Sequence, residues 1–174
     1  KTTTGRVLAG WIRPTAGKVL FKNKVVISPG LDSGKSWARK VQLIFQDPFG
    51  SLNPNIRIGD AIAEPMLVHN LAKNNREAKK RVEGLLEKVG LSAAQYNRYP
   101  HEFSGGQRQR IVIARALAVE PEILVCDESV AALDVSVQSQ VLNLLNDLQA
   151  ELGLSYIFIS HDHNVVHYFC DRVL

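Results

Sequence analysis

Short apolar runs separated by turn residues occupy the first 48 positions of the chain. The stretches between these runs are polar and contain Gly and Pro, which interrupt regular structure. The pattern predicts, in chain order, a helix over 2–11, a turn over 14–17, strands over 19–21 and 25–27, a loop over 28–40 and a strand over 41–45.

Helical spacing replaces this pattern between residues 49 and 110. Turn residues and short helical pieces come first, and a stripe of four apolar residues then falls on one face of a helix that Gly90 ends. The stripe consists of Val82, Leu85, Leu86 and Val89. The chain therefore divides into a core, made of residues 1–48 and 111–174, and a helical insert made of residues 49–110.

A continuous apolar run stands in the last third of the chain. Ile123–Cys126 contains no polar residue, which is typical of a parallel strand covered on both faces. A helix over Gly105–Val119, with Ser104 as its N-cap, precedes this strand, and an amphipathic helix and a strand over Tyr156–Ser160 follow it. Alternating strands and helices with short connections predict an α/β fold with a parallel sheet and right-handed crossovers.

Composition sets limits on the function. The chain has 174 residues, of which 45% are hydrophobic and 22% charged, so it can bury a core of ordinary size. Its net charge of +4 comes without a long run of Lys and Arg. The charge suits an anionic ligand, and we expect no nucleic-acid partner. The two cysteines form no CxxC pair, which argues against a disulfide or a zinc site.

The ends of the chain and its hydropathy bear on its cellular setting. No apolar run reaches the roughly 20 residues that a membrane-spanning helix needs, so we expect another chain to supply any membrane part. Lys1–Thr4 has no strand or turn before it, and Val173–Leu174 stops as an apolar run begins. We therefore expect this sequence to be a fragment of a longer polypeptide.

Two adjacent carboxylates, Asp127 and Glu128, directly follow the apolar strand. Ligands of open α/β sheets bind at the carboxyl ends of the strands, where one acid can hold Mg²⁺ beside a phosphate. A second acid beside it can orient or deprotonate an attacking water. The alternative is a strand that ends in a solvated acidic turn, and the short motif alone does not decide between the two.

Ser104-Gly105-Gly106-Gln107 opens a helix. Paired glycines let a ligand approach the backbone, and a helix N-terminus offers oriented N–H groups and partial positive charge. These features predict a phosphate-binding site at the start of this helix. The alternative is an ordinary N-cap in which the two glycines only make the start of the helix flexible. This alternative is less favoured because an acidic strand end follows about twenty residues later.

Two other features invite a functional interpretation. Gly34-Lys35-Ser36 looks like the end of a P-loop, but three residues separate Gly30 from Gly34 where the motif needs four. No apolar strand leads into it and no helical pattern follows, so we expect it not to contact phosphate. His161 follows the last strand, where a histidine is often only a surface residue, as we expect for His163 and His167.

Five segments together resemble the motifs of ABC ATPases, in family order and at family spacing. They are Gln46 as the Q-loop glutamine, Phe103–Gln107 as the signature motif, Ile123–Glu128 as the Walker B strand, Ala131–Asp134 as the D-loop and His161 as the switch histidine. Phe45–Pro48, Ser51–Pro54 and Arg98–Arg110 are most similar to the oligopeptide and dipeptide importer ATPases, a group that also includes nickel and glutathione systems. Ser129 and Ala131 depart from the proline and serine that are common there.

The resemblance implies a P-loop NTPase core of the RecA type, with a parallel sheet, an inserted helical subdomain and a small antiparallel β segment. It implies that Lys1, Thr2 and Thr3 end the P-loop and bind the nucleotide, the glycines of that loop preceding Lys1. It assigns Mg²⁺ to Thr2, Gln46 and Asp127, and catalysis to Glu128, His161 and Gln46. The further nucleotide-binding residues that it implies are Ser104, Gly105, Gly106, Gln107 and Asp134.

The implied activity is ATP hydrolysis that powers an importer. Expected partners are a second ATP-binding subunit, transmembrane permease subunits that dock on the helical insert and, indirectly, a solute-binding protein. The expected location is peripheral, on the cytoplasmic face of a bacterial or archaeal membrane. Two alternatives remain open at this point, namely a soluble ABC ATPase that acts on ribosomes or DNA, and a non-catalytic regulatory cassette.

Overall fold

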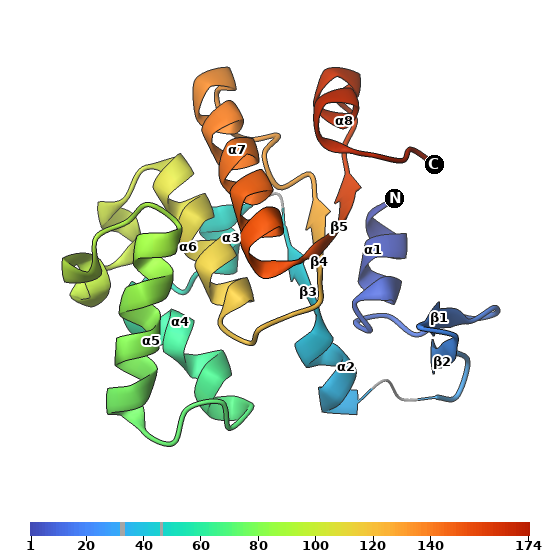
Figure 1. Ribbon diagram of the computed structural model, residues 1–174, viewed down its shortest axis with the longest axis horizontal. Helices are drawn as coiled ribbons and strands as arrows, with labels where there is room; N and C mark the ends of the chain where they lie inside the picture. The colour runs from blue at the N-terminus through green and yellow to red at the C-terminus, as the bar shows by residue number, and fades with distance from the viewer. Residues whose placement is uncertain (32–33, 46) are drawn as a thin grey trace.

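The computed structural model describes residues 1–31, 34–45 and 47–174 of the chain (Figure 1). The elements before the helical insert are α1 Thr2–Leu8, β1 Val19–Phe21, β2 Lys24–Ile27, α2 Gly34–Lys40 and β3 Val41–Ile44. Those that follow are α3 Pro48–Ser51, α4 Ile58–Val68, α5 Asn75–Lys88, the 3₁₀ helices η1 Ala93–Asn97 and η2 Pro100–Glu102, α6 Gly105–Leu117, β4 Ile123–Asp127, α7 Val135–Leu152, β5 Ser155–Ile159 and α8 His163–Phe169.

A parallel sheet with the order β3-β4-β5 lies at the centre of the core. Val41 pairs with Ile123, and Ile123 in turn pairs with Ser155, so the three strands begin together, while β4 and β5 extend one pair beyond the end of β3. The strands β1 and β2 form a separate antiparallel pair. The parallel sheet and the small antiparallel segment predicted from the sequence are both confirmed.

Side chains of the sheet alternate between two apolar clusters. On one face Ile44, Leu124 and Cys126 join the cluster of α6, α7 and the helical insert. On the other face Val41 and Val125 join a smaller cluster with Ala9 and Trp37. Figure 1 shows the result, with α1 on one side of the strands and α6 and α7 on the other. This explains why β4 has no polar residue before Asp127, since both of its faces are covered.

Gly5 allows α1 to lie directly on the sheet. A Cβ atom at this position would stand 3.0 Å from Ile159 Cδ1 and 3.2 Å from Val125 Cγ1. Both contacts are tighter than an ordinary carbon–carbon contact, so a larger residue would push the helix away from the strands. The close approach matters because Thr2, one turn earlier, begins the same helix.

The predicted loop over residues 28–40 is wrong in its second half, where α2 forms. Trp37 is buried there, and its indole N–H donates to the Leu8 carbonyl at 2.9 Å. Arg39 adds a hydrogen bond from Nε to the Val119 carbonyl at 3.1 Å. These tertiary contacts stabilise a short helix that has no apolar periodicity of its own.

The expectation that no helix follows Gly34-Lys35-Ser36 is wrong for the same reason, because these residues form the start of α2. The position of Gly34-Lys35-Ser36 in the fold nevertheless differs from the one that a P-loop next to Asp127 and Glu128 would occupy. The helix α2 leads directly into the amino end of β3, whereas Asp127 stands at the carboxyl end of the parallel strand β4.

The helical insert packs around the apolar stripe that the sequence indicates. Val82, Leu86 and Val89 are fully buried, and Leu85 is half-buried. Asn74 caps α5 by accepting a hydrogen bond from the Glu77 N–H at 3.0 Å. The proposed boundary at residue 110 lies within α6, so that one helix belongs to both the insert and the core.

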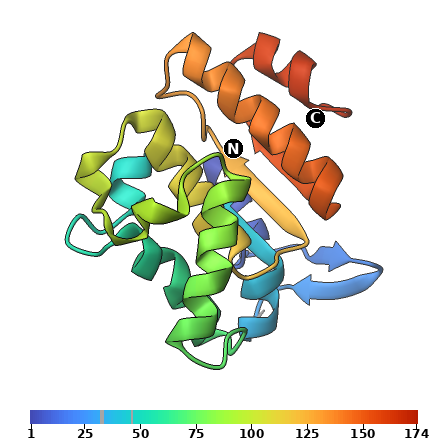
Figure 2. The same ribbon diagram turned by 60° about the vertical axis from the view of Figure 1, so that its left-hand side comes forward.

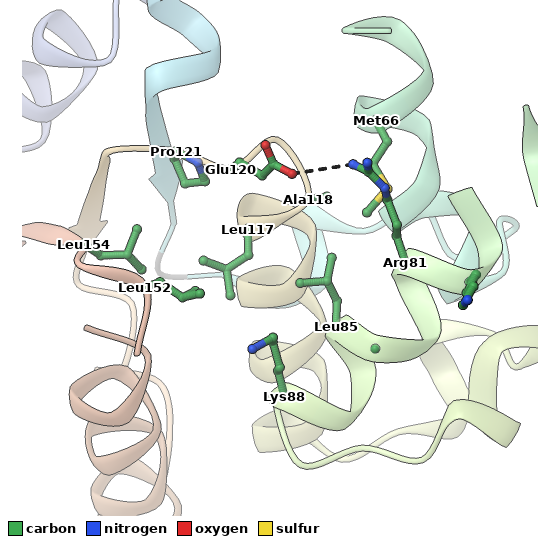
Figure 3. Close-up of a pocket in the computed structure, with 12 residues that line it drawn as sticks. Met66, Arg81, Leu85, Lys88, Leu117, Ala118, Glu120, Pro121, Leu152 and Leu154 are labelled. Atoms are coloured by element: carbon green, nitrogen blue, oxygen red, sulfur yellow. Dashed lines mark hydrogen bonds and ion pairs between the residues drawn. The ribbon is translucent and has the colours of Figure 1, made fainter. Parts of the chain in front are cut away.

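A cavity of about 480 Å³ lies where the insert meets the core (Figure 3). Leu85 of α5 and Leu117 of α6 line it together with Leu152 at the end of α7, and an ion pair of 3.5 Å between Arg81 and Glu120 spans its edge. Pro121 at its wall precedes β4, so the cavity lies at the amino end of the sheet, opposite to the acids.

Gly84 offers a test of the packing around this cavity. It is a helical residue of α5 with an exposed position, and nothing lies within 4 Å of a Cβ added there. We expect Gly84→Ala to raise the free energy of unfolding by about 0.5–1 kcal/mol, because alanine restricts the unfolded chain and favours helix. Urea denaturation of the full-length protein measures this change.

Gly90 supplies the matched control for that prediction. Its φ is +73°, and a Cβ there would lie 2.7 Å from Arg110 Nη1. Gly90→Ala should therefore lower the free energy of unfolding, the opposite sign from the same substitution at Gly84. Destabilisation by Gly84→Ala would show that α5 does not have the open surface described.

No helix of residues 1–31, 34–45 and 47–174 is long and apolar enough to cross a membrane.

Candidate functional site

Asp127 and Glu128 lie at the carboxyl end of the central strand. Asp127 is the last residue of β4 and is only 4% exposed. Glu128 leaves the strand with φ of +50°, a conformation that few residues other than glycine adopt. Its N–H donates to the Ile159 carbonyl at 2.9 Å, so β5 fixes the turn that presents the Glu128 side chain.

Residues at the start of α1 contact Asp127 and the end of β5. Thr2 Oγ1 donates to Asp127 Oδ1 at 3.2 Å, and Lys1 Nζ donates to the Ser160 carbonyl at 3.0 Å. Both contacts join positions more than a hundred residues apart in the sequence. A hydroxyl, an ammonium group and two carboxylates thus converge where β4 and β5 end.

His161 completes this group of residues. Its Nδ1 lies 3.3 Å from Glu128 Oε1, and the pair carries opposite charges when the imidazole is protonated. The His161 side chain is 69% exposed and that of Glu128 is 30% exposed, so both can reach a ligand placed over the strand ends. The site therefore combines a buried acid with an accessible acid and an accessible imidazole.

The donor set fits Mg²⁺ held against phosphate. Thr2 and Asp127 offer hard oxygen atoms, which Mg²⁺ prefers, and they already lie within hydrogen-bond distance of each other. Among the described residues, no group of three or more His, Cys, Asp or Glu side chains gathers into a metal site.

A second group of predicted residues lies at the start of α6. Ser104 caps this helix by accepting the Gln107 N–H at 3.3 Å, and the Gln107 side chain accepts the Ser104 N–H at 3.0 Å. The capping box fixes the first turn of the helix and leaves the Ser104 side chain exposed. Asp134 caps α7 in the same way, accepting the Val137 N–H at 3.0 Å.

The glycine pair of α6 packs against the residues around Asp134. A Cβ on Gly105 would make an ordinary contact of 3.7 Å with Leu133, whereas one on Gly106 would overlap Val137. Gly106 therefore allows α6 and α7 to approach closely, and Gly105 is the glycine that leaves room. The sequence predicts only ligand approach for this pair, whereas the packing of Gly106 against Val137 is evident from the structure alone.

The structure does not bring the two groups of residues together. The helix α1 lies over one face of the sheet, and α6 packs on the other, as Figures 1 and 2 show. Thr3 lies in the first turn of α1 with its side chain exposed. Gln46, predicted as a catalytic residue and a magnesium ligand, lies outside the described residues.

Comparison with known proteins identifies the family of the chain. The family model described as "ABC transporter" matches residues 1–131. The chain belongs to the ABC transporter family. The motifs at Ser104–Gln107 and Asp127–Glu128 both lie within the matched range.

Curated relatives place this ABC chain near peptide transport proteins. It is 53% identical over 176 residues to the oligopeptide transport ATP-binding protein OppF of Bacillus subtilis, covering 99% of this chain and 57% of that protein. It is 49% identical to OppF of Escherichia coli, covering 100% of this chain and 52% of that protein. The dipeptide transport ATP-binding protein DppF of Haemophilus influenzae is 48% identical. The chain thus spans about half the length of these relatives.

A solved structure confirms the fold class. The ABC chain resembles CbiO1 of Clostridium perfringens, described as part of the ABC transporter complex CbiONQ, with a TM-score of 0.81 and 29% sequence identity. The match covers 98% of this chain and 66% of CbiO1. The predicted P-loop NTPase core with a parallel sheet, a helical insert and a small antiparallel segment is therefore confirmed.

Sequence reasoning missed the residues that position the site. Gly5 seats α1 on the sheet, and Ser160 and Asp162 shape the turn after β5. Ser160 Oγ accepts the Asp162 N–H at 3.0 Å, and Asp162 caps α8 by accepting the Asn164 N–H at 2.8 Å. An Asp directly before a helix is a recognisable N-cap, so the sequence did contain a signal for this turn.

Proposed function

We propose that this chain binds and hydrolyses ATP and thereby powers an ABC importer for oligopeptides or dipeptides. The observation that carries the proposal is the convergence of Lys1, Thr2, Asp127, Glu128 and His161 at the carboxyl ends of β4 and β5. These are the cation, hydroxyl, paired acids and imidazole that phosphoryl transfer to water uses. The family and the names of the curated relatives support the same activity.

Lys1 and Thr2 hold the phosphate end of ATP in this proposal. Lys1 exchanges its bond to the Ser160 carbonyl for the β- and γ-phosphates, and Thr3 contributes to the same turn. Thr2, Asp127 and Gln46 would hold Mg²⁺. When bound, the ion would neutralise charge on the phosphate oxygens.

Glu128 and His161 act on the reacting atoms. Glu128 orients the attacking water and takes its proton, since its carboxylate is accessible and its backbone is fixed by the bond to Ile159. His161, 3.3 Å from Glu128, contacts the γ-phosphate. Most of the rate enhancement then comes from positioning and charge stabilisation, as is usual for phosphoryl transfer.

The start of α6 serves the nucleotide of a neighbouring subunit. Ser104–Gln107 and α1 pack on opposite faces of the same sheet, which argues against one shared ligand within the chain. In a head-to-tail pair, each ATP lies between Lys1–Thr2 of one subunit and the α6 start and Asp134 of the other. ATP then holds the pair together until hydrolysis releases it.

The proposed partners follow from this arrangement. They are a second ATP-binding subunit, identical or homologous, and permease subunits that contact residues 49–110. A solute-binding protein acts through the permease. The protein would work peripherally at the cytoplasmic face of the membrane, and the transport names of the curated relatives support this reading over a role on ribosomes or DNA.

Removal of Mg²⁺ tests the proposed reaction. The full-length protein should release phosphate from ATP with Mg²⁺ present, and EDTA should abolish the release, because the Asp127 carboxylate repels the phosphates unless a cation lies between them. A coupled phosphate assay measures both states. Equal phosphate release with and without EDTA would contradict the proposed site, and sedimentation with ribosomes in place of membranes would favour the alternative function.

A further inference from the structure

The cavity between the insert and the core has the size and the lining of a small-molecule site. Its volume of about 480 Å³ lies within the roughly 300–1,000 Å³ that is usual for ligand pockets. Most of its lining is apolar, with Met66, Leu117 and Leu154 buried, Leu85 half-buried and Leu152 exposed (Figure 3). An apolar molecule that covered these side chains would gain by leaving water.

Cations outnumber acids around this cavity. Lys80, Arg81 and Lys88 of α5 line it, whereas Glu120 is the one acid among its lining residues that the structure describes. Arg81 forms an ion pair with Glu120, and Lys88 forms one with Glu151. Lys80 has no such partner within the described ranges of the chain. The cation that remains to meet a ligand is therefore Lys80, and it suits an anionic group.

Gly84 leaves the cavity open between the two lysines. It lies four residues from both Lys80 and Lys88 in α5, so the three share one face of the helix. Glycine destabilises the interior of a helix relative to alanine. Nothing in the part of the chain that the structure describes lies within 4 Å of a Cβ added at Gly84, so close packing does not require a glycine there. Access to the cavity is what the missing side chain provides.

The wall around Glu120 is held in place by contacts with the core. Arg39 of α2 donates from Nε to the Val119 carbonyl at 3.1 Å, and its guanidinium lies 3.3 Å from the Glu120 carboxylate. Glu120 has φ of +54°, and its N–H donates to the Leu117 carbonyl at 2.9 Å. The wall is thus formed without a ligand, which lowers the cost of ordering the site when a ligand binds.

We propose that this cavity binds a small apolar carboxylic acid, with the apolar part against the leucines and the carboxylate at Lys80. The cavity lies at the amino end of the sheet, whereas Asp127 ends β4 at the opposite edge. The proposed site therefore holds or fails independently of the proposed ATPase function. Because Leu85 of the insert and Leu154 of the core both line it, the bound acid joins these two parts of the chain.

Isothermal titration calorimetry of the full-length protein with octanoate, without nucleotide, tests the site. We expect octanoate to bind at a single site. Octan-1-ol, which lacks the charge, should bind at least about fivefold more weakly, because it forms no charge-assisted bond to Lys80. Acetate, which lacks the apolar chain, should give no measurable binding, because the leucines then stay uncovered.

Two substitutions and a matched control locate the binding. Gly84→Leu should abolish octanoate binding by filling the opening, and its thermal midpoint should be no lower than that of the wild type, because the position has room and leucine favours helix. Lys80→Gln should weaken octanoate binding by at least about fivefold and leave octan-1-ol binding unchanged. Lys79→Gln removes the same charge from the next residue, but Lys79 lies over the Tyr96 ring outside the cavity, so octanoate binding should persist.

Several results would overturn the proposal. A wild-type protein that gives no binding heat with octanoate would do so, as would equal affinities for octanoate and octan-1-ol. Full octanoate binding by a folded Gly84→Leu variant would place the ligand elsewhere, and equal weakening by Lys80→Gln and Lys79→Gln would show that Lys80 does not select the charge. If Gly84→Leu lowers the thermal midpoint, the comparison of the two lysine variants decides the site.

Discussion

Glu128→Gln is expected to lower steady-state ATP hydrolysis by about 10²- to 10⁴-fold while ATP binding persists. The amide keeps the shape of the side chain and can still accept a contact from His161, but it cannot take a proton from water. The backbone of Glu128 is fixed by its bond to Ile159, so the substitution should leave the turn in place. Phosphate release and equilibrium binding of ATP, measured on the full-length protein, separate the two effects.

Glu122→Gln provides the matched control. Glu122 immediately precedes the same strand, at the end remote from the site, where its ion pairs with Lys22 and Lys40 lower its pKa to about 2. Its substitution should leave hydrolysis near the wild-type rate. Near-normal turnover by Glu128→Gln, or an equal loss in both variants, would reject Glu128 as the group that activates water.

A pair of substitutions at Ser104 should separate its role as a helix cap from its role toward phosphate. Asp and Asn both cap helices about as well as Ser, so α6 should begin normally in either variant. Only Asp places a negative charge where the structure exposes Ser104. We expect Ser104→Asp to hydrolyse ATP at least about tenfold more slowly than Ser104→Asn, through repulsion of the phosphates.

Two further readouts make the Ser104 comparison decisive. Thermal midpoints of the two variants should be similar, with Asp no lower than Asn, because a negative charge suits a helix N-terminus. Binding of ATP to the separated subunit should survive in both variants, since Lys1 and Thr2 belong to the other group. Equal hydrolysis rates for Asp and Asn would mean that Ser104 only caps the helix.

Much of the candidate site follows from the sequence because its residues stand at the ends of strands and the starts of helices. A continuous apolar strand must be covered on both faces, and this places Asp127 and Glu128 at an accessible edge. Ser104 and Asp134 have side chains that cap helices, and both do so. Element ends differ from the prediction by one or a few residues, as when β5 runs over Ser155–Ile159.

The parts of the fold that the sequence does not predict depend on contacts between segments far apart in the sequence. The helix α2 forms because Trp37 and Arg39 bond to Leu8 and Val119, and no local pattern indicates it. Gln109 belongs to a stretch of Gln and Arg that looks like a solvated helix face. Its side chain is nevertheless buried, close in sequence to the glycine pair that lets α6 approach α7.

In the proposed function one chain supplies two half-sites to two different nucleotides. Light scattering of full-length Glu128→Gln, alone and mixed with the second ATP-binding subunit of its transporter, measures whether ATP joins two such subunits. We expect ATP with Mg²⁺ to convert the protein to a complex of two ATP-binding subunits, and we expect Ser104→Asp, added to both subunits, to prevent this. A protein saturated with ATP that keeps the mass of a single subunit under all of these conditions would contradict it.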